Sequence, residues 1–387
     1  MLFRDRLLAA LEEQAASFDR FDAELTSRLG LLSHSLDEIG GKGYAELTRA
    51  LVNLESPGAL PTVEWDRGGR IPFGTVWPDH PSARAWALGV LEGRPTFAAD
   101  GSQIEPDKRF SVPAALIQVG WFENLHRATG DSYRKDVDMR VLGPGDLRED
   151  EVGPPKRKVD LARFELEVAA LRRYLSEATD AASRRVAFFD GSLVVSFAEK
   201  RKQDAYARRY VELVLDLLKE AEARRVPVIA YVDTSYAHDL AAMIAAYAGF
   251  KTHGGVSDGA LLTDRLGWGD RTPTAICARE GILDAYGEWS RKIGFCYLKT
   301  NSDAPPARLE YPLWLLEDGR LDEVLDVVRA EVIAGSGYPY TLAAADATAV
   351  LTMSDREAFY RALQDFLTAR HVPLRFSKKA LSKVRRR

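Results

Sequence analysis

The tripeptide Asp-Gly-Ser occurs twice in the chain, each time after an apolar run. The first copy follows PTFAA and begins at Asp100, and the second follows RRVAFF and begins at Asp190. Each copy alone is weak evidence, because Asp-Gly and Gly-Ser are common turn dipeptides. A carboxylate at the end of a buried strand, however, loses hydration that a divalent cation can replace. Two adjacent carboxylates could hold two metal ions, which activate water for phosphodiester hydrolysis.

A third acid is expected from a helix. The segment DLARFELEVAAL, within a predicted helix over residues 159–178, carries Glu165 and Glu167 on opposite sides of an apolar stripe. Glu167 neighbours Phe164 and Leu171 and so lies slightly nearer the buried face, which favours it over Glu165. A solvated helix acid is the structural alternative for both residues.

A fourth element is the stretch GYPYTLAAADATAV, over residues 337–350. Tyr-Pro before a helix of small residues predicts a sharp entry, and the alanines permit close packing against a sheet. Asp346 is an acid on this otherwise small and apolar helix, so we expect it to have a partner. Tyr338 lies at the mouth of the same helix. A capping or core role is the structural alternative.

The order of elements predicts how these acids meet. A strand bearing Asp100, an antiparallel meander, a helix, a strand bearing Asp190 and then alternating helices and strands is the order of ribonuclease H-like folds. In that architecture the two Asp-bearing strands are neighbours in the sheet. We therefore expect an α/β fold with a ribonuclease H-like mixed sheet flanked by helices. The predicted strands cover residues 95–100, 112–122, 136–143, 184–190, 226–233, 292–300 and 307–316.

Three regions are predicted: a helical N-terminal segment (1–60), a nuclease-like core (61–370) and a basic C-terminal tail (371–387). SPGALP (56–61) has turn chemistry, and residues 65–86 are expected to be irregular. Further helices are predicted from about 204 to 224, from near Tyr236, and over 321–334, 341–351 and 355–369.

Composition limits the class of protein. The chain has 387 residues and a formal net charge of −4, so bulk charge gives no attraction to nucleic acid. Basic residues are concentrated at 156–158, at 200–202 and in the tail from 375 to 387. No apolar stretch is long enough to span a membrane, and no signal core begins the chain. Cys277 and Cys296 lack metal or redox spacing and are expected to be reduced core residues of a cytoplasmic protein.

Taken together, these motifs resemble the NurA nucleases of DNA end processing. The resemblance covers about residues 95–351 and rests on both Asp-Gly-Ser copies, Arg163 with Glu167, ARLEYP and GYPYTLAAAD. It implies a homodimer that cleaves DNA with manganese, magnesium being the alternative, through 5′–3′ exonuclease and single-strand endonuclease activity. It also implies end resection with a HerA-type hexameric ATPase. The site it implies is Asp100, Glu167, Asp190, Tyr338 and Asp346, all but Tyr338 being metal ligands.

Two positions depart from the family pattern. Some members have His where this chain has Asp346, so metal preference is open. Some have Lys at the position of Asp233, which is either a supporting acid or has no catalytic role.

The sequence lacks the residues that other classes of hydrolase or ATP-binding protein require. A haloacid dehalogenase-type phosphatase needs a second Asp two positions earlier, where this chain has Ala98 and Phe188. The six histidines show no zinc spacing, and neither a Gly-x-Ser-x-Gly elbow nor a P-loop occurs. The remaining alternative is a catalytically silent DNA clamp or adaptor on a ribonuclease H-like scaffold. Acids at every expected position argue against it.

Overall fold

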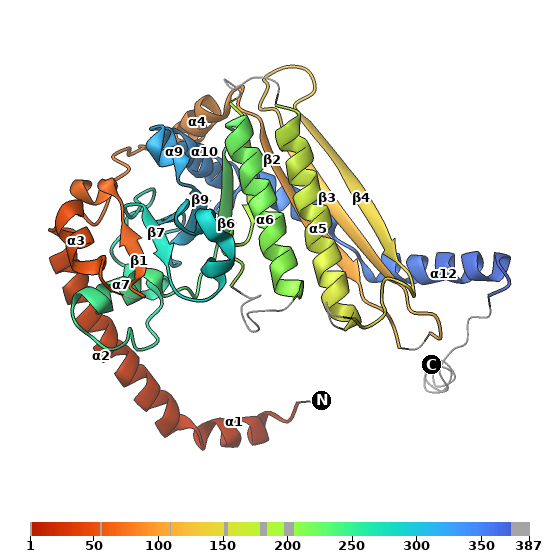
Figure 1. Ribbon diagram of the computed structural model, residues 1–387, viewed down its shortest axis with the longest axis horizontal. Helices are drawn as coiled ribbons and strands as arrows, with labels where there is room; N and C mark the ends of the chain where they lie inside the picture. The colour runs from red at the N-terminus through yellow and green to blue at the C-terminus, as the bar shows by residue number, and fades with distance from the viewer. Residues whose placement is uncertain are drawn as a thin grey trace. The chain divides into compact units, whose positions relative to one another are not determined.

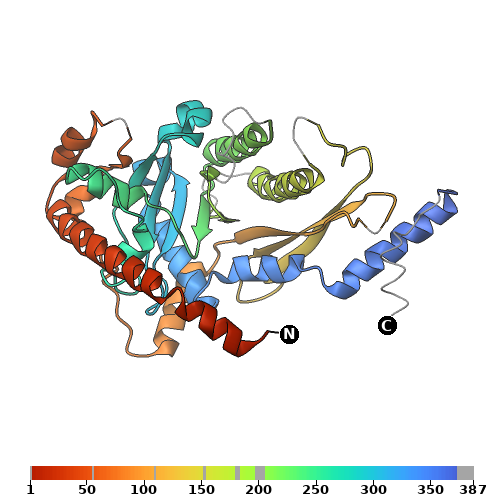
Figure 2. The same cartoon turned by 90° about the horizontal axis from the view of Figure 1, so that it is seen from below.

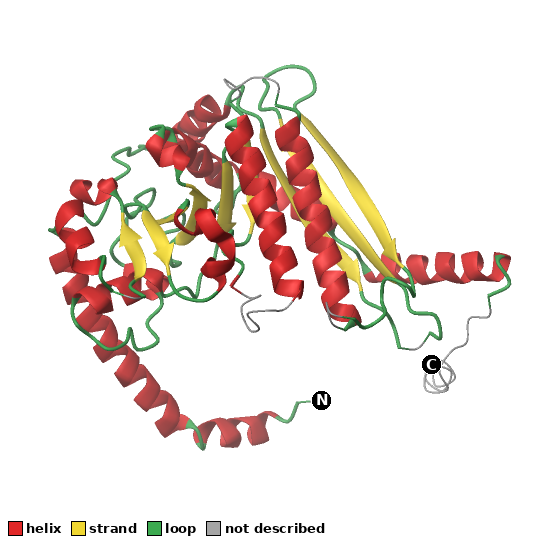
Figure 3. Cartoon of the chain, viewed as in Figure 1, coloured by secondary structure: helices red, strands yellow, loops and turns green. Residues whose placement is uncertain are grey.

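The computed structural model describes residues 2–54, 56–108, 110–150, 154–178, 184–196 and 205–372 (Figure 1). The chain divides into two compact units. Unit 1 comprises Met1–Thr75, Val232–Glu280 and Ser290–Leu309, and unit 2 comprises Val76–Tyr231, Gly281–Trp289 and Glu310–Arg387. Helices and strands mix in both units, which confirms the predicted α/β class (Figure 3). The predicted boundaries at residues 60 and 370 stay predictions, and residues 200–202 and 375–387 lie outside the described part.

Unit 1 contains the helical N-terminal segment and a short antiparallel sheet. Strand β7 pairs with β1 on one side and with β8 on the other. Cys277 and Cys296 are buried free cysteines in these strands. The elements of unit 1 are α1 (Arg4–Glu12), α2 (Ala15–Gly40), α3 (Tyr44–Leu51), β1 (Gly58–Pro61), η1 (Val63–Arg67), α7 (Asp239–Tyr247), α8 (Asp258–Leu262), β7 (Ala275–Ala278), β8 (Ile293–Leu298) and the start of β9 (Ala307–Pro312).

Unit 2 is built on strands in the order β6-β5-β2-β3-β4. The β2–β3 and β3–β4 pairs are antiparallel, whereas β2–β5 and β5–β6 are parallel. The two strands predicted to carry aspartates are thus neighbours. The elements are α4 (His80–Leu91), β2 (Thr96–Ile104), β3 (Ala115–Asn124), β4 (Tyr133–Leu142), α5 (Pro155–Ser176), β5 (Val186–Asp190), α6 (Ala205–Arg224), β6 (Val228–Val232), η3 (Ile282–Arg291), α9 (Trp314–Glu317), α10 (Leu321–Ala334), α11 (Tyr340–Ala349) and α12 (Met353–Ala369).

Helices cover both faces of the unit 2 strands. Figure 2 shows α5 and α6 on one face and α11 on the other. Strand β5 is buried from Val186 to Phe189, as expected of a parallel strand covered on both sides. None of the helices among the described residues combines the length and apolar composition needed to cross a membrane.

Several predicted elements differ from the structure. The segment 56–61 is not only a turn, since β1 pairs with β7 over Gly58–Pro61. The region 65–86 is irregular only over residues 68–79. Helix α4 begins at His80, where Asp79 caps it by accepting a hydrogen bond from the Ser82 N–H. Strand β7 and helix α8 were not predicted, because both are too short for a periodic pattern.

The first Asp-Gly-Ser is not at a strand end, contrary to the prediction. Strand β2 continues through Asp100, which is opposite Gly120, as far as Ile104, which is opposite Leu116. The pairing of β2 with β5, however, ends at Ala99. Asp100 is therefore the first residue at which β2 has lost its β5 neighbour. The second copy does end its strand, since Asp190 closes β5 and Gly191 turns the chain at φ +114°.

The start of α11 is tied to the start of β2 by a buried carboxylate. Glu331 on α10 accepts hydrogen bonds from the Thr341 N–H (2.8 Å), the Thr341 hydroxyl (2.9 Å) and the Thr96 hydroxyl (2.8 Å). His126 Nε2 lies 3.1 Å from the same carboxylate. Because Glu331 is fully buried, these contacts replace its lost hydration. They thereby set where α11 begins relative to β2.

We expect Gly120→Ala to destabilise the protein by about 1–3 kcal/mol, the usual cost of overpacking. A Cβ at this position would lie 2.4 Å from the Ala349 nitrogen and 2.6 Å from the Thr348 carbonyl carbon, so α11 would have to lift from β3. The free energy of unfolding from urea denaturation measures the effect.

Gly89→Ala in α4 is the matched control. A Cβ there meets nothing within 4 Å, and alanine is favoured over glycine inside a helix. This variant should be stabilised by about 0.5–1 kcal/mol. Equal free energies for Gly120→Ala and the wild type would show that α11 does not depend on the small residue.

Candidate active site

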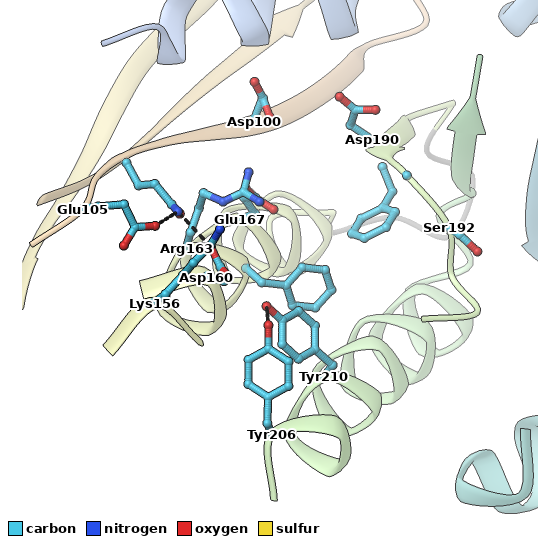
Figure 4. Close-up of a pocket in the computed structure, with 14 residues that line it drawn as sticks. Asp100, Glu105, Lys156, Asp160, Arg163, Glu167, Asp190, Ser192, Tyr206 and Tyr210 are labelled. Atoms are coloured by element: carbon cyan, nitrogen blue, oxygen red, sulfur yellow. Dashed lines mark hydrogen bonds and ion pairs between the residues drawn. The ribbon is translucent and has the colours of Figure 1, made fainter. Parts of the chain in front are cut away.

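Asp100 and Asp190 lie where strands β2 and β5 part. Ala99 is opposite Phe189 in the parallel register, so the next residues of the two strands are Asp100 and Asp190. Side chains alternate along a strand, so both aspartates point to the same face. Figure 4 shows the two carboxylates on that face, at the rim of a cavity. The structure thus brings together the two carboxylates that the sequence predicted to meet.

Asp346 adds a third carboxylate from α11. Burial raises the pKa of Asp100 to about 6, against a hydrogen bond from the Gly101 N–H that lowers it. The charge of Asp190, and the hydrogen bond and charge of Asp346, raise this pKa further. Partial burial also raises the pKa of Asp190, and Asp346 adds to the rise while Arg163 opposes it. The three aspartates therefore form one repelling cluster.

Glu167 approaches from the opposite face of the sheet. Its position depends on Gly101, because a Cβ there would lie 2.3 Å from Glu167 Oε1. Arg163 Nη1 is 3.2 Å from the same oxygen and donates a hydrogen bond of 3.1 Å to the Gly101 carbonyl. Burial raises the pKa of Glu167 to about 8, Arg163 lowers it, and Asp100 and Asp190 raise it. The Arg163 contact is an ion pair without hydrogen-bond geometry, and Oε1 of Glu167 accepts no hydrogen bond from the described residues.

The Glu165 side chain on α5 is directed toward arginines of β4 and α6 rather than into the cavity. Its carboxylate accepts a hydrogen bond of 3.2 Å from Arg140 Nη1 and one of 3.0 Å from Arg209 Nε. Of the two helix acids left open by the sequence, the structure places Glu167 at the cavity and Glu165 outside it.

The cavity has a volume of about 500 Å³, and Asp100, Asp190 and Glu167 line it together. Its other end holds Lys156 and the paired hydroxyls of Tyr206 and Tyr210, which lie 3.2 Å apart (Figure 4). At the same end the Gln103 amide donates hydrogen bonds to the carboxylates of Glu105 (2.7 Å) and Asp160 (2.8 Å). The cavity thus combines a carboxylate end with a mixed polar and aromatic end.

Tyr338 does not line the cavity. Its ring meets the ring of Tyr231 edge-on, with centroids 5.3 Å apart. Tyr231 is directly opposite Asp190 on the neighbouring strand β6. Asp233, just beyond β6, is exposed and accepts a hydrogen bond of 3.4 Å from the Thr234 hydroxyl. It is not among the residues that line the cavity.

Glu310 is a supporting residue that the sequence did not predict. Its buried carboxylate accepts hydrogen bonds from the Ser192 hydroxyl (2.8 Å) and the Leu193 N–H (2.7 Å). These bonds hold the turn that follows Asp190. The available signal was an acid in ARLEYP, a segment otherwise suited to a buried strand, which implies a buried partner.

The oxygen donors fit a hard divalent cation such as Mn²⁺ or Mg²⁺. A cation would offset the repulsion among the aspartates and could be bound by Oε1 of Glu167, which is paired with Arg163 but accepts no hydrogen bond. Within the described ranges, no three His, Cys, Asp or Glu side chains are already close enough together to hold a metal ion. The three aspartates are thus near enough to affect one another's charge but are not assembled as a ligand shell. Glu167 lies apart from them, on the other face of the strands.

Comparison with known proteins places these residues in a family. The family model described as the NurA domain matches residues 94–351, which is more than half of the chain. No curated protein matches the chain. Two solved structures resemble it at low identity. "Crystal structure of NurA with manganese" has a TM-score of 0.40 at 12% identity, covering 71% of this chain and 89% of that chain. "Crystal structure of NurA bound to dAMP and manganese" has a TM-score of 0.35 at 10% identity, covering 71% and 88%.

We expect Asp100→Asn to raise the free energy of unfolding of the metal-free protein at pH 8 by about 1–2 kcal/mol, after allowance for solvent screening, and so to raise its melting temperature. The folded pKa of Asp100, about 6, is above the ordinary value of 3.8. Ionisation therefore destabilises the folded state progressively as the pH rises through this interval. At pH 4 the carboxyl is largely protonated, so the difference between variant and wild type should shrink.

Melting temperatures in excess chelator at both pH values measure this difference. Asp131→Asn, at an exposed loop position of the same unit, is the matched control and should change little. A gain that is as large at pH 4 as at pH 8 would show that charge repulsion is not its cause.

Proposed function

The chain belongs to the NurA family, as its motifs predicted, and on that premise we propose that it is a metal-dependent deoxyribonuclease. The observation that carries the proposal is the convergence of Asp100, Asp190 and Asp346 where β2 and β5 part. A protein that only clamps DNA gains nothing from three mutually repelling carboxylates, which weaken both its folded state and its hold on phosphates.

The aspartates and Glu167 are the proposed ligands of two cations, manganese being preferred and magnesium the alternative. Such cations supply a nucleophilic water and stabilise charge on the scissile phosphate. Arg163 orients Glu167 through its contacts with that carboxylate and with the Gly101 carbonyl. Glu310 holds the turn after Asp190. Lys156, which lines the same cavity, is placed to meet a phosphate of the bound strand.

Tyr338 is also proposed as a site residue. The support is its ring contact with Tyr231, the residue opposite Asp190 on β6. A tyrosine hydroxyl in this position can donate a hydrogen bond to a phosphate oxygen.

The proposed activity is 5′–3′ exonuclease and single-strand endonuclease cleavage at DNA ends, in the repair of double-strand breaks. We further propose that the chain acts in the cytoplasm as a homodimer with a HerA-type hexameric ATPase. The sequence has no P-loop, so ATP-driven movement of DNA would come from that partner. The basic residues 375–387 are a proposed DNA contact.

Linear DNA should be cleaved by the wild-type protein with Mn²⁺ and left intact in excess chelator. We expect Asp190→Asn to lower the cleavage rate more than about 100-fold, since losing even a residue that only supports a metal ligand costs about 10- to 100-fold. Cleavage of an end-labelled duplex, followed on denaturing gels, measures the rate.

Asp131→Asn is again the control and should cleave at the wild-type rate. DNA that stays intact with every divalent cation tested, while binding is retained, would replace the nuclease with the silent clamp or adaptor.

The two helix acids should separate in the same assay. Glu167→Gln should lower cleavage more than about tenfold and weaken Mn²⁺ binding, whereas Glu165→Gln should cleave at the wild-type rate. Loss of the Glu165 ion pairs with Arg140 and Arg209 should cost at most about 1 kcal/mol of stability, as for exposed pairs. Calorimetric Mn²⁺ titration of both variants is the second measurement. Equal losses of cleavage and of Mn²⁺ binding in Glu167→Gln and Glu165→Gln would contradict the assignment of Glu167 as the metal ligand on α5.

A further inference from the structure

A second cavity of about 410 Å³ lies between α11 and the β3–β4 strands of unit 2. We call it the aromatic groove. Its volume is within the range of small-molecule sites, about 300–1,000 Å³. The residues that line it are Phe122, Tyr133, Lys135, Tyr340, Ala343, Ala344, Ala347 and Thr348. It shares no lining residue with the carboxylate cavity.

Three rings from three elements meet in the aromatic groove. Phe122 on β3 is buried, whereas Tyr133 on β4 is 53% exposed and Tyr340 on α11 is 43% exposed. The Phe122 and Tyr133 rings are stacked, with centroids 5.5 Å apart and an interplanar angle of 22°. Tyr340 meets Phe122 edge-on, at 5.8 Å and 83°. One buried ring thus supports two rings that keep much of their surface open to a planar ligand.

Lys135 gives the aromatic groove a positive charge. It is opposite Phe122 in the β3–β4 register, so it extends from the same face of the sheet as the rings. It is exposed, and within the described part of the chain it forms no ion pair. Its neighbours Arg134 and Asp136 alternate to the opposite face. An aromatic platform beside an unpaired cation is the combination that holds a base and its phosphate.

The aromatic groove and the aspartates flank the same helix. The buried side of α11 rests on β3, where the Gln118 amide donates a hydrogen bond of 3.1 Å to the Ala349 carbonyl. By helical angle, Asp346 projects from one flank and Thr348 from the other. A helix with its side chains is about 10 Å across, and each strand of a DNA duplex advances about 3.4 Å per nucleotide. An unpaired strand can be more extended, so a strand crossing α11 over Ala343 and Ala347 would span it in at most about three nucleotides.

We propose that the aromatic groove binds an unpaired base of single-stranded DNA, within about three nucleotides of the phosphate held at the aspartates. The base stacks on Tyr133 and Tyr340, and Lys135 contacts the adjacent phosphate. An unpaired strand is required, because the bases of a duplex already stack on one another and present no free face. The ligand class rests on the proposed function, but the binding itself does not require cleavage.

Equilibrium binding of a fluorescent single-stranded oligothymidine in excess chelator tests the proposal without hydrolysis. Tyr133→Ala and Tyr340→Ala should each weaken binding about tenfold, as expected for the loss of one stacked base. Tyr340→Phe should bind like the wild type, because it keeps the ring. Tyr236→Ala, at a tyrosine that is 80% exposed in unit 1, is the matched control and should bind like the wild type.

An oligonucleotide of the same length with abasic sites separates stacking from charge. The wild-type protein should bind this abasic oligonucleotide more weakly, and Tyr340→Ala should not weaken that binding further. Lys135→Ala should still weaken the binding of the abasic oligonucleotide and make it less dependent on salt. Equal weakening of both oligonucleotides by Tyr340→Ala would overturn the proposal.

The rival occupant is a second copy of the chain, since Met139 and Val141 on the same face of β4 are also exposed. Light scattering of each variant decides this. A change of oligomeric state with unchanged oligonucleotide binding would overturn the proposal. If the wild type cuts no DNA but Tyr133→Ala and Tyr340→Ala still weaken oligonucleotide binding, the proposed nuclease function is wrong and base binding in the aromatic groove is supported. If the wild type cuts DNA but neither tyrosine variant weakens binding, base binding in the groove is wrong and the nuclease function is supported.

Discussion

Repulsion among Asp100, Asp190 and Asp346 is the constraint around which unit 2 is organised. The charges of Asp190 and Asp346 raise the pKa of Asp100, and the charge of Asp346 raises that of Asp190, so ionisation of the site opposes folding when no metal is bound. Contacts elsewhere in unit 2 hold the three aspartates in place. The parallel pairing of β2 with β5 up to Ala99 and Phe189 aligns two of them. The carboxylate of Glu331, bonded to Thr96 and Thr341, anchors the helix that carries the third.

Two glycines let helices reach the sheet from both sides. Gly101 leaves room for Glu167 and Arg163 below β2, and Gly120 leaves room for the end of α11 above β3. A methyl group at either position would collide with atoms closer than 3 Å. The candidate site is therefore a consequence of close helix–sheet packing at two particular residues, and those residues matter for the site although neither carries a functional group.

The acids do not all lie on one face. Figure 4 places Asp100 and Asp190 on one side of the strands, and Glu167 on the other side beside Arg163. In the metal-free chain Arg163 partly compensates the buried Glu167. A cation that recruits Glu167 must compete with that guanidinium. In the proposed metal site, binding of the cation by Glu167 and the position of Arg163 would therefore be linked.

The sequence by itself determined the acids and the order of the elements around them. Apolar runs of strand length and the stripe on α5 are local patterns, so β3, β5 and α5 follow from neighbouring residues in the chain, and their order made β2 and β5 adjacent. Only the tertiary structure shows that Glu167 lines the cavity and Glu165 does not, because both flank the same stripe and Glu165 is drawn away by the arginines of β4 and α6. It alone extended β2 past Asp100, since that extension depends on pairing with β3. Glu310 and the aromatic groove likewise required the fold, because their partners are separated along the chain and meet only when the sheet and α11 have packed.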